Sequence, residues 1–315
     1  MTEEKKRVAV IFPGQGSQTV GMMDELAEHF DVVKATFDEA STALGFDLWQ
    51  ITQDESRLHD TQFTQPALLA ASVAIWRIIE PKLAQQNIKP AYLAGHSLGE
   101  YSALVVAGVL SFADAVKLVH ERGKLMTKAV IGMDTQMAAV LGLDDEQVSS
   151  LCEDAKENAG IVNPANFNSP GQVVVAGTMV GVSYVLNAVE VLGKRAVPLK
   201  VSVPSHCELM STASQALAEL LSATTFHHAN IPVIQNRHAE VHRATNDIKT
   251  ALTEQLSMPV QWAKTMQALA DKQIDLLIEC GPGNVLSNLA KRQAEPIVAL
   301  PTDKLTRLEK LEHLS

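Results

Sequence analysis

Gly95-His96-Ser97-Leu98-Gly99 stands between a short apolar segment, residues 91–94, and a run with a helical pattern, residues 100–106. A serine flanked by glycines at such a strand-to-helix junction is typical of a nucleophile elbow, because the sharp turn pushes the serine side chain outward. The first-turn N–H groups of the following helix would face an oxyanion formed at Ser97, with the Leu98 N–H as the first donor. The same pentapeptide also occurs by chance in ordinary turns, so it needs support from the rest of the chain.

Other apolar runs predict a parallel sheet around this turn. Residues 8–12 are continuously apolar, the pattern of a strand that helices cover on both faces, and residues 275–279 are interpreted as another buried strand. The first run ends at Pro13-Gly14-Gln15-Gly16-Ser17-Gln18, where Gln15 could offer a side-chain or backbone N–H. A dinucleotide-binding loop is an alternative, but Thr19 stands where that motif has its third glycine; a plain strand-to-helix turn is the other alternative.

Composition narrows the class of protein. The 315 residues are 46% hydrophobic and 20% charged, as in an ordinary globular protein, and the net charge of -10 argues against a nucleic-acid partner, because phosphates bind to basic surfaces. The apolar run near the amino terminus is too short for a secretory signal and no stretch is long enough to span a membrane, so a cytoplasmic protein is expected. Cys152, Cys207 and Cys280 form no C-x-x-C pair, which argues against disulfides and a zinc site.

The pattern changes between residues 134 and 203. Strand and helix patterns follow one another as strand, helix, strand, strand, helix, strand, at residues 137–143, 145–158, 160–166, 172–176, 180–192 and 196–203. This order is the ferredoxin-like pattern. We therefore expect an α/β protein with a core domain formed by residues 1–133 and 204–315, into which residues 134–203 are inserted as a small domain.

Arg122 lies on the apolar face of a predicted helix. The helix is expected to begin at Ser111, and its apolar stripe contains Val119 and Met126, three residues before and four residues after Arg122. A buried arginine needs a partner, because burying a lone charge is prohibitive. The partner could be an interior Asp or Glu, or the aliphatic part of the side chain could extend toward the surface and place the guanidinium in solvent. Alternatively, the guanidinium binds a substrate carboxylate bidentately.

His206 is a candidate general base. Ser205-His206-Cys207-Glu208 matches a capping box, which predicts His206 in a first helical turn, where the helix dipole would keep the ring neutral near pH 7. A surface histidine at a helix start is the alternative. A second predicted helix, residues 247–256, must end near Pro259, so the carbonyl of Gln255 is free to accept an N–H from a histidine ring.

No role is predicted for the remaining histidines, and the charged tail from Asp303 onward is expected to be frayed.

Six motifs together resemble one family. They are residues 12–18 (FPGQGSQ), 95–103 (GHSLGEYSA), 122–123 (RG), 166–172 (NFNSPGQ), 203–207 (VPSHC) and 281–283 (GPG). In this order they resemble the malonyl-CoA:acyl-carrier-protein transacylases, the stand-alone bacterial acyltransferases of fatty-acid synthesis. Polyketide acyltransferase domains share the fold but usually differ in the three residues before the histidine. Gln235 departs from the family pattern, in which an asparagine commonly precedes Asn236.

The resemblance implies a fold and a set of roles. It implies an α/β-hydrolase-like core with a parallel sheet, an inserted ferredoxin-like domain, and an active site in the cleft between them. The implied roles are Ser97 as nucleophile, His206 as its base, Gln255 as the backbone-carbonyl partner of the histidine, Gln15 and Leu98 as backbone donors of the oxyanion hole, Arg122 as the ligand of the malonyl carboxylate, and Asn166 and Asn168 as further substrate-binding residues.

The expected reaction is ping-pong transfer of a malonyl group from malonyl-CoA to the phosphopantetheine thiol of acyl carrier protein, through a malonyl-serine. Coenzyme A enters as part of the substrate; no permanently bound cofactor, metal, nucleic acid or membrane partner is expected, and the chain is expected to be a monomer. Three alternatives stay open: a polyketide-type malonyl acyltransferase, a serine esterase or thioesterase, and a non-catalytic module that binds acyl groups or carrier proteins. A hydrolase of this kind usually has its histidine late in the chain, whereas the last histidine here, His313, lies in the charged tail.

Overall fold

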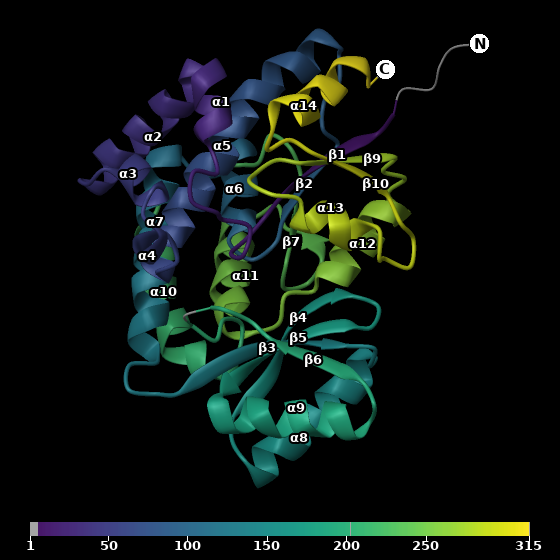
Figure 1. Cartoon of the computed structure of the whole chain (residues 1–315). Helices are drawn as coiled ribbons and strands as arrows, with labels where there is room; N and C mark the ends of the chain where they lie inside the picture. Colours follow the sequence, from purple (N-terminus) through teal and green to yellow (C-terminus); the bar gives the residue numbers. More distant parts are fainter. Residues whose placement is uncertain (1–5, 202, 315) are drawn as a thin grey trace.

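The computed structural model describes residues 6–201 and 203–314, and its strands form two separate sheets (Figure 1). The larger sheet has six strands in the order β10-β9-β1-β2-β7-β8, all parallel to their neighbours except β8. Its strands are β1 (Val8–Phe12), β2 (Tyr92–Gly95), β7 (Val233–Gln235), β8 (Glu240–Val241), β9 (Leu276–Glu279) and β10 (Val298–Pro301). The predicted parallel sheet is therefore present.

Strand β1 shows why the central strands are apolar throughout. All five of its residues are buried, and they alternate between two cores: Val8, Val10 and Phe12 face one cluster, Ala9 and Ile11 the other. Because both faces of the strand are buried, the alternation of apolar and polar residues that is usual in a half-exposed strand is absent. The helices around this sheet are α1 (Asp24–His29), α2 (Asp31–Leu44), α3 (Leu48–Thr52), α4 (Glu55–Leu58), α5 (Thr61–Gln85), α6 (Gly99–Val106), α7 (Phe112–Ala129), α10 (Ser211–Ala223), α11 (Thr245–Ser257), α12 (Trp262–Asp271), α13 (Val285–Ala290) and α14 (Leu305–Leu308).

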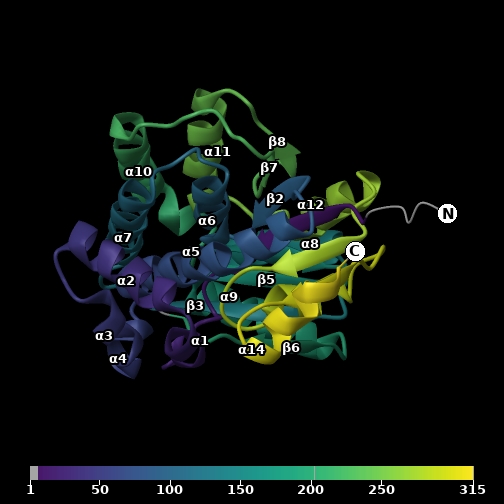
Figure 2. The same ribbon diagram turned by 90° about the horizontal axis from the view of Figure 1, so that it is seen from above.

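Helices α7, α10 and α11 lie side by side at one flank of the molecule, as both ribbon views show (Figures 1 and 2). Helix α7 begins as predicted, because the Ser111 hydroxyl oxygen accepts the N–H of Asp114 at 3.1 Å. Its predicted apolar stripe is buried, and Arg122 is buried with it. The flank therefore carries Arg122 on α7 and Gln255 on α11 toward the centre of the molecule.

The smaller sheet is antiparallel, with the strand order β4-β5-β3-β6. Its elements are β3 (Thr135–Leu141), α8 (Asp145–Asn158), β4 (Val162–Ser169), β5 (Gln172–Thr178), α9 (Met179–Val191) and β6 (Arg195–Pro198). The predicted sequence of strands and helices is present, although β6 ends at Pro198, earlier than expected. Val173 and Val175 pack with the α8 and α9 core, whereas Val174 belongs to a cluster on the opposite face of the sheet.

Backbone hydrogen bonds join the smaller sheet to the segment between α11 and α12. Strand β4 forms an isolated parallel bridge between Asn166 and Val260, the residue that precedes the α12 segment. The Phe167 N–H donates to the Val260 carbonyl at 3.0 Å, and the Val260 N–H donates to the Ala165 carbonyl at 2.9 Å. Because backbone groups make this link, it fixes β4 against the segment between α11 and α12 whatever the side chains are.

The prediction of a frayed carboxyl-terminal tail is wrong. Helix α14 and the 3-10 helix η2 (Glu309–His313) follow β10, and Leu308 and Leu311 are buried in the main core. Lys82 on α5 also pairs with Glu312 at 3.0 Å. Charged residues dominate this segment, but the leucines at a spacing of three cover apolar surface and hold it in place.

None of the helices that the structure describes is both long and apolar enough to cross a membrane.

Candidate active site

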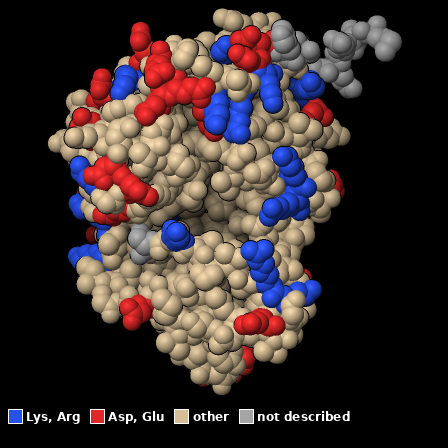
Figure 3. All heavy atoms as spheres, viewed as in Figure 1, with Lys and Arg blue, Asp and Glu red and all other residues tan. Residues whose placement is uncertain are grey.

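A cavity of about 410 Å³ opens between the two sheets and forms the hollow of the face seen in Figure 3. Its walls come from the loop after β1, the turn between β2 and α6, the inner face of the smaller sheet and helix α13. Seven of the eight residues to which the sequence assigned a role line it: Gln15, Ser97, Leu98, Arg122, Asn166, Asn168 and His206. The eighth, Gln255, is buried directly behind it.

Ser97 occupies a strained turn that its surroundings hold on both sides. Its φ of 52° is in the left-handed region, which a residue with a side chain rarely adopts. The Ser97 N–H donates to the Asn236 Oδ1 at 2.6 Å, and the Ser97 carbonyl accepts from the Gln255 Nε2 at 3.1 Å. A Cβ on Gly99 would lie 2.0 Å from the Phe12 carbonyl oxygen, so only glycine lets the chain enter α6 here.

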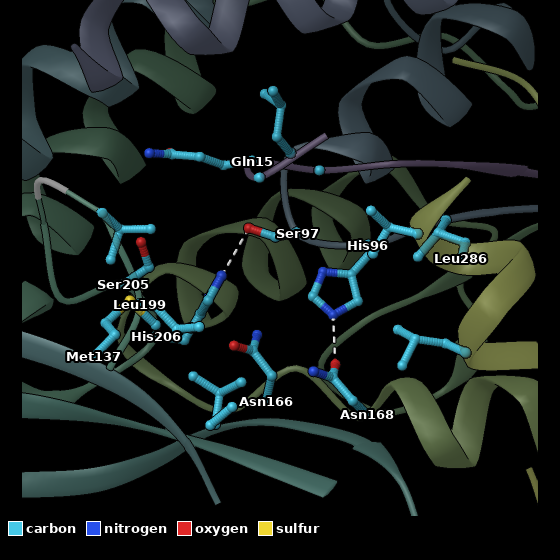
Figure 4. Close-up of a pocket in the computed structure, with 18 of the residues that line it drawn as sticks. Gln15, His96, Ser97, Met137, Asn166, Asn168, Leu199, Ser205, His206 and Leu286 are labelled. Carbon is cyan, nitrogen blue, oxygen red and sulfur yellow. Dashed lines mark hydrogen bonds between the residues drawn. The ribbon is translucent and has the colours of Figure 1, made fainter. Parts of the chain in front are cut away.

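Ser97 and His206 form a hydrogen-bonded pair (Figure 4). The Ser97 Oγ lies 2.7 Å from the His206 Nε2, and the His206 Nδ1 lies 2.6 Å from the Gln255 carbonyl oxygen. Because a carbonyl only accepts, Nδ1 carries the proton and Nε2 is left to accept the serine hydroxyl. Burial and, to a smaller extent, the charge of Arg122 lower the pKa of His206 to about 3. The ring is therefore neutral near pH 7, as a general base must be.

The predicted location of His206 in a first helical turn is wrong. His206 has a φ of 62° and precedes both the 3-10 helix η1 (Glu208–Met210) and α10. The expected capping box does not form, since the Glu208 N–H donates to Asn163 Oδ1 instead. The His206 N–H donates to the Leu256 carbonyl, which fixes the turn against α11. The imidazole is neutral because it is buried beside Arg122, and the helix dipole is not the cause.

Gln15 and Leu98 both line the cavity that contains Ser97. Neither the Gln15 N–H nor the Leu98 N–H donates to another atom of the residues that the structure describes. The Gln15 side chain turns away to Thr61 Oγ1 at 3.2 Å, so it leaves the backbone N–H unobstructed. A backbone N–H without an acceptor beside a serine hydroxyl is free to bind an oxyanion.

Arg122 is buried without a direct acidic partner. It is 1% exposed; its Nη1 donates to the Gln65 Oε1 at 2.7 Å and its Nη2 to the Gln255 Oε1 at 3.1 Å. Its Nε finds no acceptor among the described residues, and the Tyr101 ring lies 5.5 Å from the guanidinium carbon. Of the alternatives left open, the direct ion pair and the outward-reaching stem are both excluded. A cation held by neutral amides at a cavity wall can bind an anionic ligand group.

Asn168 lies at the cavity but already has a protein partner. Its Oδ1 lies 2.8 Å from the His96 Nε2 (Figure 4). The centroids of the His96 and Trp262 rings are 5.3 Å apart. Asn166 lies between His206 and Asn168 in the same view and is 6% exposed. His96 was assigned no role from the sequence, although its position directly before Ser97 is the signal that places it at the cavity.

Comparison with known proteins agrees with this geometry. Residues 9–302 match the family described as acyl transferase domain. The chain belongs to the acyl transferase family. The malonyl CoA-acyl carrier protein transacylase of Salmonella typhimurium is 49% identical over 295 residues, which cover 92% of this chain and 94% of the relative. The enzyme of the same name from Bacillus subtilis is 43% identical and covers 91% of this chain and 90% of its own.

Solved structures show the same fold. FabD from Acinetobacter baumannii is 48% identical, with a TM-score of 0.93 and 99% of each chain covered. A malonyl-transacylase solved in complex with a type II polyketide acyl-carrier protein is 43% identical, with a TM-score of 0.94, and covers 98% of this chain and 100% of its own. No group of three or more His, Cys, Asp or Glu side chains among the described residues is placed to hold a metal ion.

Proposed function

We propose that this protein transfers a malonyl group from malonyl-CoA to the phosphopantetheine thiol of acyl carrier protein, in fatty-acid synthesis. The observation that carries the proposal is the 2.7 Å contact between the Ser97 Oγ and a neutral His206 Nε2, in a cavity that is also lined by Arg122, a buried cation whose hydrogen-bond acceptors are neutral amides. The names of the Salmonella and Bacillus relatives support the choice of both substrates.

The first half-reaction acylates Ser97. His206 Nε2 takes the hydroxyl proton while the Ser97 Oγ attacks the thioester carbonyl, and the Gln15 and Leu98 N–H groups bind the oxyanion. The Gln255 carbonyl holds the Nδ1–H of the imidazolium that forms, so no acidic third member touches the ring. When the tetrahedral intermediate collapses, the carbon–sulfur bond breaks and His206 returns the proton to the coenzyme A sulfur.

The second half-reaction runs the same steps in reverse with a different thiol. The phosphopantetheine thiol gives its proton to His206 and attacks the malonyl-serine carbonyl, and Ser97 recovers the proton as it leaves. Arg122 binds the free malonyl carboxylate, while Asn166 and Asn168 border the bound acyl chain. Malonyl-CoA and the malonyl carrier protein are both thioesters, so the overall transfer is near energetic balance, and positioning and oxyanion stabilisation account for the catalysis.

We further propose that residues 1–133 and 204–315 form an α/β-hydrolase-like core and residues 134–203 an inserted ferredoxin-like domain. The strand orders of the two sheets and the alternation from β3 to β6 support this division. The reaction is proposed to take place in the cytoplasm, by a monomer without a resident cofactor.

A polyketide carrier is a second candidate acceptor, because a transacylase 43% identical to this chain was solved in complex with a type II polyketide acyl-carrier protein. A polyketide-type role would use the same cavity and chemistry. Transfer rates to a fatty-acid carrier and a polyketide carrier, measured side by side, separate the two pathways.

The test of the main proposal is the intact mass of the protein after malonyl-CoA is added, before and after addition of holo acyl carrier protein. Wild type should gain one malonyl group and lose it to the carrier, and Ser97→Ala should gain none. A malonyl adduct of unchanged yield on Ser97→Ala would contradict the assignment of the nucleophile. Steady release of free malonate without a carrier would instead favour a thioesterase.

A further inference from the structure

Glu100 is a buried acid that the reaction described above does not use. It lies in the first turn of α6, three residues after Ser97, and is 0% exposed. Its Oε2 accepts the Asn236 N–H at 3.0 Å and the Gln255 Nε2–H at 2.8 Å, while its Oε1 has no partner among the described residues. A carboxyl group buried at this depth is costly unless its hydrogen bonds or its charge serve a purpose.

The two partners of Glu100 are the same residues that hold Ser97 and His206. Asn236 accepts the Ser97 N–H through its side chain, and Gln255 donates to the Ser97 carbonyl through its own. The main chain of Gln255 accepts the His206 Nδ1–H. One carboxyl group therefore anchors both residues that fix the strained serine, and one of them also orients the base.

We propose that Glu100 is a positioning residue for acyl transfer, which in its ionised form holds Asn236 and Gln255 in place and supplies the negative charge that stabilises the imidazolium formed on His206. This inference rests on the proposed function. In a Ser-His-Asp triad an acid performs this task in direct contact with the ring. Here a neutral carbonyl makes the contact, and the charge is one residue further away, across Gln255.

The charges around Glu100 allow it to titrate in the working pH range. Burial raises the pKa of Glu100 to about 7, while the Asn236 and Gln255 N–H groups and the charge of Arg122 on α7 oppose the rise. Tyr101 on α6 and His206 are the other titratable groups of this cluster; burial raises the pKa of Tyr101 to about 12 and lowers that of His206 to about 3. Of Glu100, Tyr101 and His206, only Glu100 has a pKa close to 7, so a change in its charge is expected to appear in the acylation rate in this pH range.

The test compares Ser97 acylation rates of wild type and Glu100→Gln, followed by quenched intact mass between pH 5.5 and 8.5, with malonyl-CoA and acetyl-CoA. Gln keeps the shape and the accepting oxygen but removes the charge. We expect Glu100→Gln to acylate about tenfold more slowly at pH 8 with both substrates, because a hydrogen bond to a charged group is stronger than one to a neutral group. As the pH drops through 7, the acylation rate of wild type should fall to that of Glu100→Gln, whereas the rate of Glu100→Gln should not change with pH.

Glu279→Gln is the matched control. Glu279 is also 0% exposed, its carboxylate accepts the Leu286 and Ser287 N–H groups, and burial raises its pKa as well. This variant should keep the pH dependence of wild type, and thermal unfolding of both variants should show that they are folded.

Two results would overturn the inference. Wild-type rates and pH dependence in Glu100→Gln would mean that its charge has no part in acylation. A change in the ratio of malonyl to acetyl rates alone would make Glu100 a counter-ion of Arg122 instead. If wild type itself formed no acyl adduct, the proposed function would fail, and this outcome is distinct from both.

Discussion

Arg122 is a buried cation whose hydrogen-bond partners are neutral. Two amide oxygens, from Gln65 and Gln255, hold the guanidinium without cancelling its charge. An arginine with an acidic partner in contact would be satisfied by the protein alone, and a substrate carboxylate would compete with that partner. The arrangement found here has no acid in contact with the guanidinium, which supports the proposal that Arg122 selects dicarboxylic acyl groups.

Arg122→Ala should therefore separate malonyl-CoA from acetyl-CoA. Removing one member of a desolvated charge pair costs roughly 2–5 kcal/mol, which corresponds to a fall of about two to three orders of magnitude in kcat/KM for malonyl-CoA. Acetyl-CoA has no carboxylate to lose, so its rate should hold or rise. The measurement is the ratio of kcat/KM for the two substrates in variant and wild type.

Arg77→Ala is the control for that ratio. Arg77 is a partly exposed arginine on α5 that pairs with Glu39, and it lines no part of the cavity. The ratio of kcat/KM for malonyl-CoA to that for acetyl-CoA in Arg77→Ala should equal the ratio in wild type. A parallel fall for both substrates in Arg122→Ala would show that Arg122 has a structural role.

At the next larger scale, the turn between β2 and α6 depends on close backbone contact. Helix α6 starts against β1, and Gly99 lies where a Cβ would be 2.0 Å from one backbone atom, the Phe12 carbonyl oxygen. A backbone neighbour cannot move aside as a flexible side chain does. The element that presents Ser97 is therefore fixed by the packing of two chain segments about 87 residues apart in sequence, counting from Phe12 to Gly99.

Gly99→Ala should lower the free energy of unfolding by about 3 kcal/mol or more, because the overlap forces the helix away from β1. It should also abolish the Ser97 adduct. Urea unfolding followed by circular dichroism measures the first effect, and intact mass the second.

Gly45→Ala is a useful comparison for this effect. Gly45 has a left-handed backbone conformation, with a φ of 79°, whereas Gly99 does not; a Cβ at Gly45 would meet no atom within 4 Å. It should cost only the strain of a left-handed residue, about 1–2 kcal/mol, and leave acylation intact. Equal losses in the two variants would contradict the steric explanation for Gly99.

The whole molecule carries a net charge of -10, yet both expected ligands, coenzyme A and acyl carrier protein, are anionic. Docking therefore needs local basic groups, and Lys and Arg side chains border the hollow in Figure 3. Lys194 and Arg195 are exposed at the start of β6, and Lys291 and Arg292 at the end of α13. Arg292 donates to Gln172, a residue of the cavity wall.

Charge reversal at Lys194 and Arg195, or at Lys291 and Arg292, should raise the KM for carrier protein several-fold at low salt and weaken its dependence on ionic strength. Lys156→Glu on α8 is the control, because α8 packs with the opposite face of the smaller sheet. A pair whose reversal leaves the KM unchanged at low salt takes no part in docking.

Local signals in the sequence predicted much of this protein. Apolar runs predicted the buried strands, the Ser111 cap and the apolar stripe predicted α7, and glycines around Ser97 predicted the turn. Each of these depends on residues a few positions apart, whose side-chain spacing determines local structure. The contact between the Gln255 carbonyl and a histidine ring was also foreseen, because a helix that must end before a proline leaves carbonyls unpaired.

The tertiary structure alone decided the remaining features of the site. The neutral state of His206 comes from burial beside Arg122, the carboxyl-terminal tail is held by leucines that reach a distant core, and Glu100 meets its partners across 136 and 155 residues. Burial and long-range hydrogen bonds depend on which segments the fold brings together. Sequence spacing carries no record of such pairs, since the free energy of each contact appears only when both partners lie in the same dry interior.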